Sequence, residues 1–151
     1  MVKNCVKRFS VTMVSLLLIF AFSISSFAAE NEKVIKTYTE DMGNGITAVV
    51  KISEVESMAR TTARKNISKS YYSGSTYIGT AVLTATFNYN GSTSSAVSAS
   101  GSGSGANGWS YSGQSTHTSG KSAYLTASLK NGSKTVGVSL SLTCDANGNV
   151  S

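Results

Sequence analysis

The chain has 151 residues, with 13 Lys and Arg against seven Asp and Glu, one histidine and two cysteines. This length suits one domain with a modest core. One histidine and two cysteines are too few for a four-ligand zinc site, and we expect neither a metal nor a cofactor. Three of the basic residues lie in the first 28 residues and all seven acids lie beyond them, which leaves a net charge of about +3. Such a small charge does not favour nucleic acid as a partner.

Residues 1–28 have the organisation of a signal peptide. A basic start precedes an apolar run over residues 11–24, and Ala28 ends a small-residue cleavage motif. The run is shorter than the roughly 20 residues of a membrane helix. We therefore expect cleavage after Ala28, a secreted extracellular protein, and no stable membrane span once the signal is removed. An uncleaved anchor is the alternative.

The rest of the chain is dominated by β-strand patterns. We assign residues 29–37 to a flexible N-terminal segment and residues 38–149 to a single β-sandwich domain. Apolar and polar residues alternate in runs separated by turn signals such as Asn131-Gly132. These runs predict seven strands, at about 46–55, 63–72, 77–89, 92–99, 109–117, 122–130 and 134–144. Seven short strands predict an all-β fold, a seven-stranded antiparallel sandwich that is immunoglobulin-like in general architecture.

Residues 100–108 are rich in glycine and serine and are expected to form a long loop inside this domain. As an interdomain linker they would leave about 43 residues after them, too few for a domain without disulfides or a metal. Adding Gly-Ser residues to such a loop would cost little. Trp109 and Tyr111 would then begin the next strand.

Charge is segregated along the chain. Residues 30–56 hold six of the seven acids, whereas the later residues are mainly basic. Four of the basic residues form a cluster: Arg60, Arg64, Lys65 and Lys69. The cluster is interpreted either as a binding site for an anionic surface, such as a cell-wall polymer, or as a solvated strand edge that lysine keeps soluble.

Catalytic patterns are weak. His117 is the only histidine, and serine is so abundant that a serine near it carries no information. Glu54 and Glu56 share a strand face, but solvation of an edge explains them equally well. The segment 145–149 resembles part of a calcium loop but is better interpreted as a C-terminal turn. We expect no catalytic residue and no enzyme.

Cleavage of the leader would remove Cys5 and leave Cys144 without an intramolecular partner. Cys144 is the last of the apolar residues that occupy every second position of the final strand. This position predicts a buried thiol that packs as a small hydrophobic side chain. A disulfide-linked homodimer through Cys144 is the alternative.

Aromatic residues are the remaining candidates for ligand binding. Aromatic rings on a β-face can stack on sugars or peptides. The candidates are Trp109, Tyr111 and Tyr124. Trp109 has a second interpretation as the central core residue of a small sandwich.

Three stretches, YTEDMGNGI at 38–46, GTAVLTATFNYNG at 79–91 and SLTCDANGNVS at 141–151, resemble small secreted β-rich proteins of Gram-positive, gut Firmicutes-type bacteria. This group has no assigned activity, so the resemblance implies bacterial secretion and supplies no catalytic residue. Our hypothesis is a secreted non-enzymatic module that binds a glycan or protein of the cell envelope or of a host surface. A secreted antimicrobial or toxin-like effector is the alternative, suggested by small size, export and the basic cluster.

Overall fold

The computed structural model describes residues 32–55 and 61–151. The expected signal peptide and Arg60 lie outside the described residues. The described chain forms eight β-strands: β1 (Glu32–Gly43), β2 (Ile46–Val55), β3 (Thr62–Ser73), β4 (Thr76–Tyr89), β5 (Ser94–Gly105), β6 (Ser110–Ser119), β7 (Ser122–Asn131) and β8 (Lys134–Thr143). The all-β class is confirmed, with eight strands instead of seven. No helix capable of crossing a membrane occurs within residues 32–55 and 61–151.

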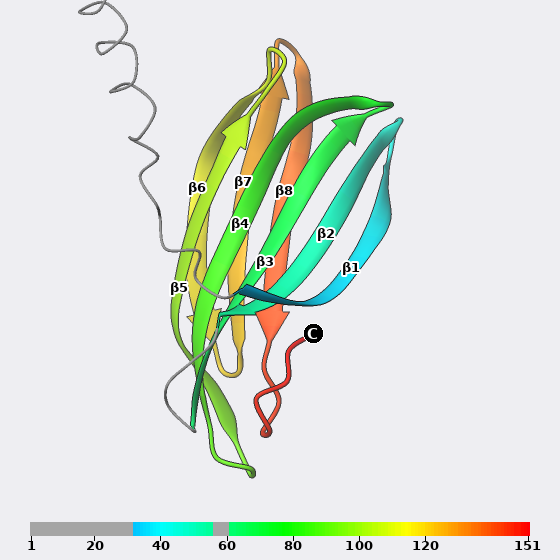
Figure 1. Cartoon of the computed structure of the whole chain (residues 1–151). Helices are drawn as coiled ribbons and strands as arrows, with labels where there is room; N and C mark the ends of the chain where they lie inside the picture. Colours follow the sequence, from blue (N-terminus) through cyan, green and yellow to red (C-terminus); the bar gives the residue numbers. More distant parts are fainter. Residues whose placement is uncertain (1–31, 56–60) are drawn as a thin grey trace, which may run out of the picture.

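The strands form two antiparallel sheets that face one another. One sheet has the order β1-β2-β3-β4-β5 and the other has the order β6-β7-β8, and Figure 1 shows the smaller sheet behind the larger one. Within each sheet, every strand pairs with the next strand in the chain. The chain passes from the larger sheet to the smaller one between β5 and β6. An immunoglobulin sandwich has Greek-key connections instead. The immunoglobulin-like arrangement is therefore not what these strands adopt.

The core lies between the two sheets and follows the alternation seen in the sequence. Val50 of β2 and Phe87 of β4 are fully buried, as are Leu125 and Leu129 of β7. Leu140 of β8 packs in the same cluster. Side chains alternate across a strand, so every second residue of each of these strands enters this layer.

The glycine-serine stretch is a strand and not a loop. β5 runs through Gly105 and pairs with β4 along its whole length, so that only residues 106–109 connect β5 to β6. Over residues 100–105 its serines point outward and its glycines inward. A Cβ on Gly101 would lie 2.2 Å from Leu125 Cδ1, and one on Gly103 would lie 2.4 Å from the Tyr111 ring. The glycines are needed because the opposite sheet comes too close for any side chain.

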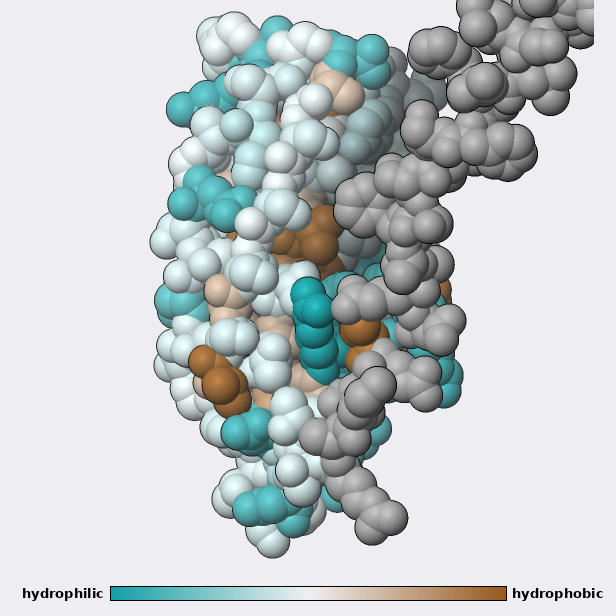
Figure 2. Space-filling view, turned by 60° about the vertical axis from the view of Figure 1, so that its left-hand side comes forward, coloured by the Kyte–Doolittle hydropathy of each residue, from teal (hydrophilic) through white to brown (hydrophobic). Residues whose placement is uncertain are grey.

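Outward serine gives this part of the surface a neutral character. In Figure 2 the side of the molecule that carries β5 and β6 is turned forward and is mostly pale, which marks residues that are neither strongly hydrophilic nor hydrophobic. Val97 is an exception at 55% exposure, and it sits at a register shift between β4 and β5. An alternation of size, Gly against Ser, therefore replaces the usual alternation of hydropathy in this strand.

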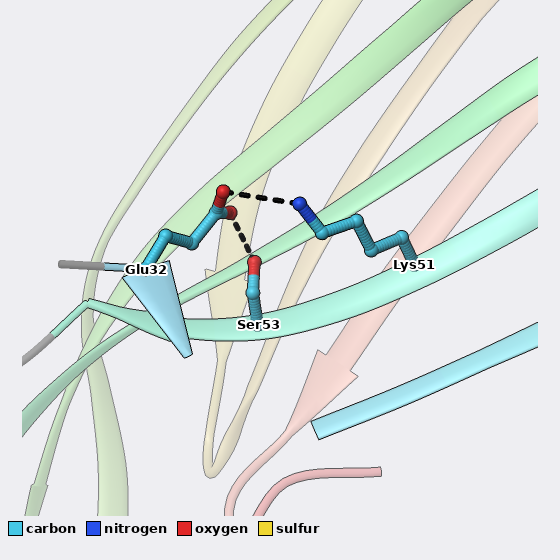
Figure 3. Close-up of polar contacts among 3 residues, drawn as sticks. All are labelled: Glu32, Lys51 and Ser53. Atoms are coloured by element: carbon cyan, nitrogen blue, oxygen red, sulfur yellow. Dashed lines mark hydrogen bonds and ion pairs between the residues drawn. The ribbon is translucent and has the colours of Figure 1, made fainter. Parts of the chain in front are cut away.

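β1 is the strand that the sequence patterns did not predict, since the seven predicted strands correspond to β2–β8. Within the segment 29–37, which the sequence predicts to be flexible, the described residues 32–37 instead belong to β1 and pair with β2. Figure 3 shows why the start of β1 is held: the Glu32 carboxylate accepts a hydrogen bond from the Ser53 hydroxyl and pairs with Lys51 Nζ at 3.1 Å. Ser53 is buried, so the carboxylate supplies a partner for a hydroxyl that has little access to water.

This contact makes the stability of β1 depend on pH. The hydrogen bond from Ser53, followed by that from Lys51, holds the pKa of Glu32 below its ordinary value. A lowered folded-state pKa stabilises the fold above the unfolded pKa, and this contribution is lost as the pH falls through the folded value. We expect Glu32→Gln to lower the thermal midpoint at pH 7 and to lower it less as the pH falls toward 3, measured by circular dichroism. An equal loss at both values would contradict a role for the ionised carboxylate.

Candidate functional site

The turns of a sequential antiparallel sheet alternate between its two ends, and this places four connections together. The β1–β2, β3–β4 and β7–β8 turns and the β5–β6 connection all lie at the upper end of the molecule in Figure 1. Trp109 is in the β5–β6 connection, directly before β6 begins. This end of the sandwich is thus built from short connections, one of which carries Trp109.

Trp109 lines two adjoining hollows at this end. The first, of about 400 Å³, lies between the β1–β2 turn and the start of β8. The second, of about 380 Å³, lies between the starts of β4 and β8. Three residues line both hollows: Ser73, Trp109 and Lys134. We call the pair the Trp109 hollows; each is at the lower end of the volumes typical of small-molecule sites.

The rest of the lining is mainly polar and uncharged. It supplies amide and hydroxyl groups from three different turns, Asn44, Thr76, Asn131 and Ser133, beside apolar contact from Met42, Ile46, Ile78 and Val136. Among the described residues that line the two hollows, none carries a carboxylate. An aromatic ring surrounded by hydrogen-bonding groups suits a ligand with both apolar faces and hydroxyls.

Short local contacts fix the position of Trp109. The backbone N–H of Trp109 donates to Ala106 O at 3.1 Å, and that of Ala106 donates to Ile78 O at 3.0 Å. Asn107 Nδ2 donates to Tyr77 O at 2.7 Å. Asn107 and Gly108 both have positive φ values, 51° and 82°, which a tight reversal needs. The connection is therefore tied to the start of β4, and Trp109 is half-buried against the core.

Tyr111, the second aromatic candidate, does not line either hollow. It is half-buried beneath β5, where its ring lies against Gly103. Its hydroxyl donates to Gln114 Oε1 at 2.9 Å, and burial raises its pKa. Tyr111 fills the space that the glycine leaves, so its role in this structure is packing.

Tyr124, the third candidate, lies on the other side of the three-stranded sheet. It has the outward parity in β7, pairs with His117 of β6, and stacks on that imidazole with ring centroids 4.9 Å apart. The structure therefore does not bring the three aromatic candidates together. His117 is exposed.

The basic cluster is divided between opposite faces of β3. Arg64 is exposed on the outer face. Lys65 and Lys69 point inward and are buried, with only 3% and 8% of their surfaces exposed. Lys65 Nζ pairs with Glu54 Oε1 at 2.7 Å, and Lys69 Nζ pairs with Glu40 Oε2 at 2.5 Å. These two lysines cannot bind an anionic surface in this structure, and a surface site that includes them is wrong.

Cys144 and the C-terminal turn match their expectations. Cys144 is fully buried, and burial raises the pKa of its thiol. A disulfide to a second copy would require the end of the chain to move away from the core. Asp145 Oδ1 accepts hydrogen bonds from the backbone N–H groups of Asn147 and Asn149, both at 2.8 Å, which makes segment 145–149 a closed turn. No cluster of three metal-binding side chains occurs in the described part of the chain.

The sequence did not reveal Lys134, Asn44 or Asn131 as site residues. Each lies in or beside a turn, and turn chemistry already explained both asparagines. The sequence nevertheless held one indication of the site, because consecutive hairpins would place the turn at Asn44 and the turn at Asn131 at the same end of the sandwich. This inference requires the assumption that every strand follows its neighbour in sequential order.

The chain matches no protein-family model, no curated protein and no solved structure.

Proposed function

We propose that the protein is a secreted, non-enzymatic binding module that holds a glycan of the cell envelope or of a host surface in the Trp109 hollows. The observation that carries this proposal is that the half-buried Trp109 lines two adjoining hollows whose linings also supply hydroxyl and amide groups. Sugar rings present apolar C–H faces that stack on an indole and hydroxyls that bond to such groups.

The geometry also supports binding without a conformational change of the protein. The residues around Trp109 sit on short turns held by strands, and the connection that carries Trp109 is bonded to the start of β4. A ligand would therefore lose little affinity to ordering the site. Secretion enters the proposal from the leader pattern in residues 1–28 and from the resemblance to secreted bacterial proteins.

The alternative, an antimicrobial or toxin-like effector, rested partly on the basic cluster. Two members of that cluster are buried in ion pairs, Lys65 with Glu54 and Lys69 with Glu40. No observation at the Trp109 hollows favours this alternative, and we therefore propose the glycan-binding function alone.

Removing the indole tests the proposal. We expect Trp109→Ala to lower the affinity for a bound glycan at least about tenfold, which corresponds to about 1.4 kcal/mol, because the stacking surface is lost. Trp109→Phe keeps a ring and should retain part of the binding. The measurement is a pull-down on insoluble bacterial cell wall and a glycan array, followed by calorimetry with the ligand that is found.

Two controls separate binding from folding. Tyr124→Ala removes an aromatic side chain from the outer face of the three-stranded sheet, outside both hollows, and should leave binding unchanged. Trp109→Ala should cost about 1–2 kcal/mol of stability, since the ring is half-buried, so each variant is first shown by thermal unfolding to be folded at the assay temperature. Failure of the wild-type protein to bind any wall or glycan would overturn the proposal, as would equal binding by Trp109→Ala.

A further inference from the structure

Lys134 stands out among the residues around Trp109. It is the charged member of the described lining, and it borders both hollows. Lys134 has the same parity in β8 as Val136 and Val138, so its side chain leaves the strand on the inner side. It is exposed, and within the described part of the chain it makes none of the ion pairs found.

The nearby acid does not neutralise this lysine. Asp41 is close to the first hollow along the chain, but it pairs with Thr47 on the outer parity of β1. Its Oδ1 accepts the backbone N–H of Gly43 at 2.8 Å, which commits the carboxylate to the β1–β2 turn. The hollows therefore combine an aromatic surface, neutral hydrogen-bonding groups and one unneutralised positive charge.

From this combination we propose that the preferred ligand is an acidic glycan, with a sugar ring on Trp109 and a carboxylate or phosphate group on Lys134. This inference rests on the proposed function and names its ligand class. An ammonium group is a compact point charge that binds either anion. Since Ser73, Trp109 and Lys134 border both hollows, the charged group lies at the junction and a glycan of two or more units extends to either side of it.

The experiment compares chemically matched ligands. Oligogalacturonates are tested against the same oligosaccharides after reduction of their carboxyl groups, and a sugar phosphate is tested against its free sugar. We expect wild-type protein to bind the acidic member of a pair about tenfold more tightly at low salt, because a hydrogen bond to a charged group contributes more than a neutral one. The preference should shrink in 1 M NaCl. A preference for the oligogalacturonates over their reduced forms would identify a carboxylate as the recognised group, and a preference for the sugar phosphate over its free sugar would identify a phosphate.

Variants assign the effect to one side chain. Lys134→Gln should remove the preference and change the affinity for the neutral ligand less than about twofold, and Lys134→Glu should reverse the preference. Lys130→Gln is the matched control, because it makes the same change in net charge on the outer parity of β7 and lies outside both hollows. The thermal midpoints of all three variants are compared first, and an exposed lysine should leave them nearly unchanged.

The outcomes separate this inference from the proposed function. Equal binding of acidic and neutral ligands, with loss of both in Trp109→Ala, would overturn the acidic preference and leave glycan binding in place. An equal effect of Lys134→Gln and Lys130→Gln would reduce the preference to net charge and would also overturn the assignment. Absence of binding to every ligand would count against both proposals.

Discussion

Gly105→Ala is expected to lower the free energy of unfolding by about 3 kcal/mol or more, because there is no space for its methyl group. A Cβ at this position would lie 2.0 Å from the carbonyl oxygen of Trp109, 2.5 Å from its carbonyl carbon and 2.8 Å from Ser110 Cα. These are backbone atoms of the connection that carries the indole. The substitution must therefore separate β5 from β6 or displace Trp109.

Gly137→Ala is the matched control for this prediction. Gly137 also lies inside a strand, β8, but nothing is within 4 Å of an added Cβ and its φ is not positive. Alanine there should be neutral or stabilising by about 0.5 kcal/mol, since glycine loses more conformational freedom on folding. Urea titrations of both variants measure the difference. Equal stability would show that β5 and β6 do not approach as closely as described.

The two preceding inward glycines should rank below Gly105. At Gly103 the new methyl group would meet the rigid ring of Tyr111, and at Gly101 its nearest contact is the mobile end of Leu125. A side chain can turn aside more easily than backbone, and a flexible end more easily than a ring. We therefore expect the cost to fall from Gly105→Ala to Gly103→Ala to Gly101→Ala.

The second large effect concerns the ion pair that ties β1 to β3 across β2. Glu40→Gln should destabilise the protein by about 2 kcal/mol, because it leaves the ammonium of Lys69 without a counter-charge in the interior. The side chain of Lys69 is 10% exposed and that of Glu40 is 35% exposed. Partial hydration of Glu40 places the expected cost below that of a fully buried pair.

The double variant makes the prediction sharper. Lys69→Met replaces the buried charge with an apolar chain of similar length, and the partner Glu40 can still reach water. In Glu40→Gln/Lys69→Met neither charge remains. The loss of unfolding free energy in this double variant should therefore be smaller than the sum of the losses in the two single variants. Lys51→Gln is the comparison, because the Lys51–Glu32 pair is 39% and 36% exposed and should contribute under 1 kcal/mol. Additive single effects in urea titrations would contradict coupling between Glu40 and Lys69.

These predictions show where sequence patterns succeed and where they do not. In β4, β7 and β8 the apolar residues recur at every second position, and this period alone predicted the strands and their inward faces, down to the burial of Cys144. In β1 the period is absent because the strand lies at an open edge, where only Tyr38 and Glu40 are even half-buried. A strand with nothing to bury leaves no hydrophobic signal.

The candidate site was predicted only in part. Trp109 was identified as an aromatic in a mainly polar region, and it borders both hollows. Tyr111 was grouped with Trp109 because it is only two residues away in the sequence. Tyr124 was grouped with them because it alternates with the apolar residues of its strand and so was expected to face outward. Both residues belong to the three-stranded sheet, but Tyr111 lies on its inner face beneath a glycine and Tyr124 lies on its outer face. Distances between faces and ends of a sandwich do not follow from positions along the chain.

What the sequence determined by itself was the local order: strands with a period of two, turns at Asn-Gly pairs, and the inward parity that Ala63, Ile67 and Tyr71 share with the lysines between them. These properties depend on neighbours in the chain. Only the tertiary structure decided that the glycines of β5 lie inside, that Lys65 and Lys69 are paired in the interior, and that three other connections lie at the same end as the one that carries Trp109. Each of these depends on how closely two sheets approach and which strands face one another, which is set by contacts between residues far apart in the sequence.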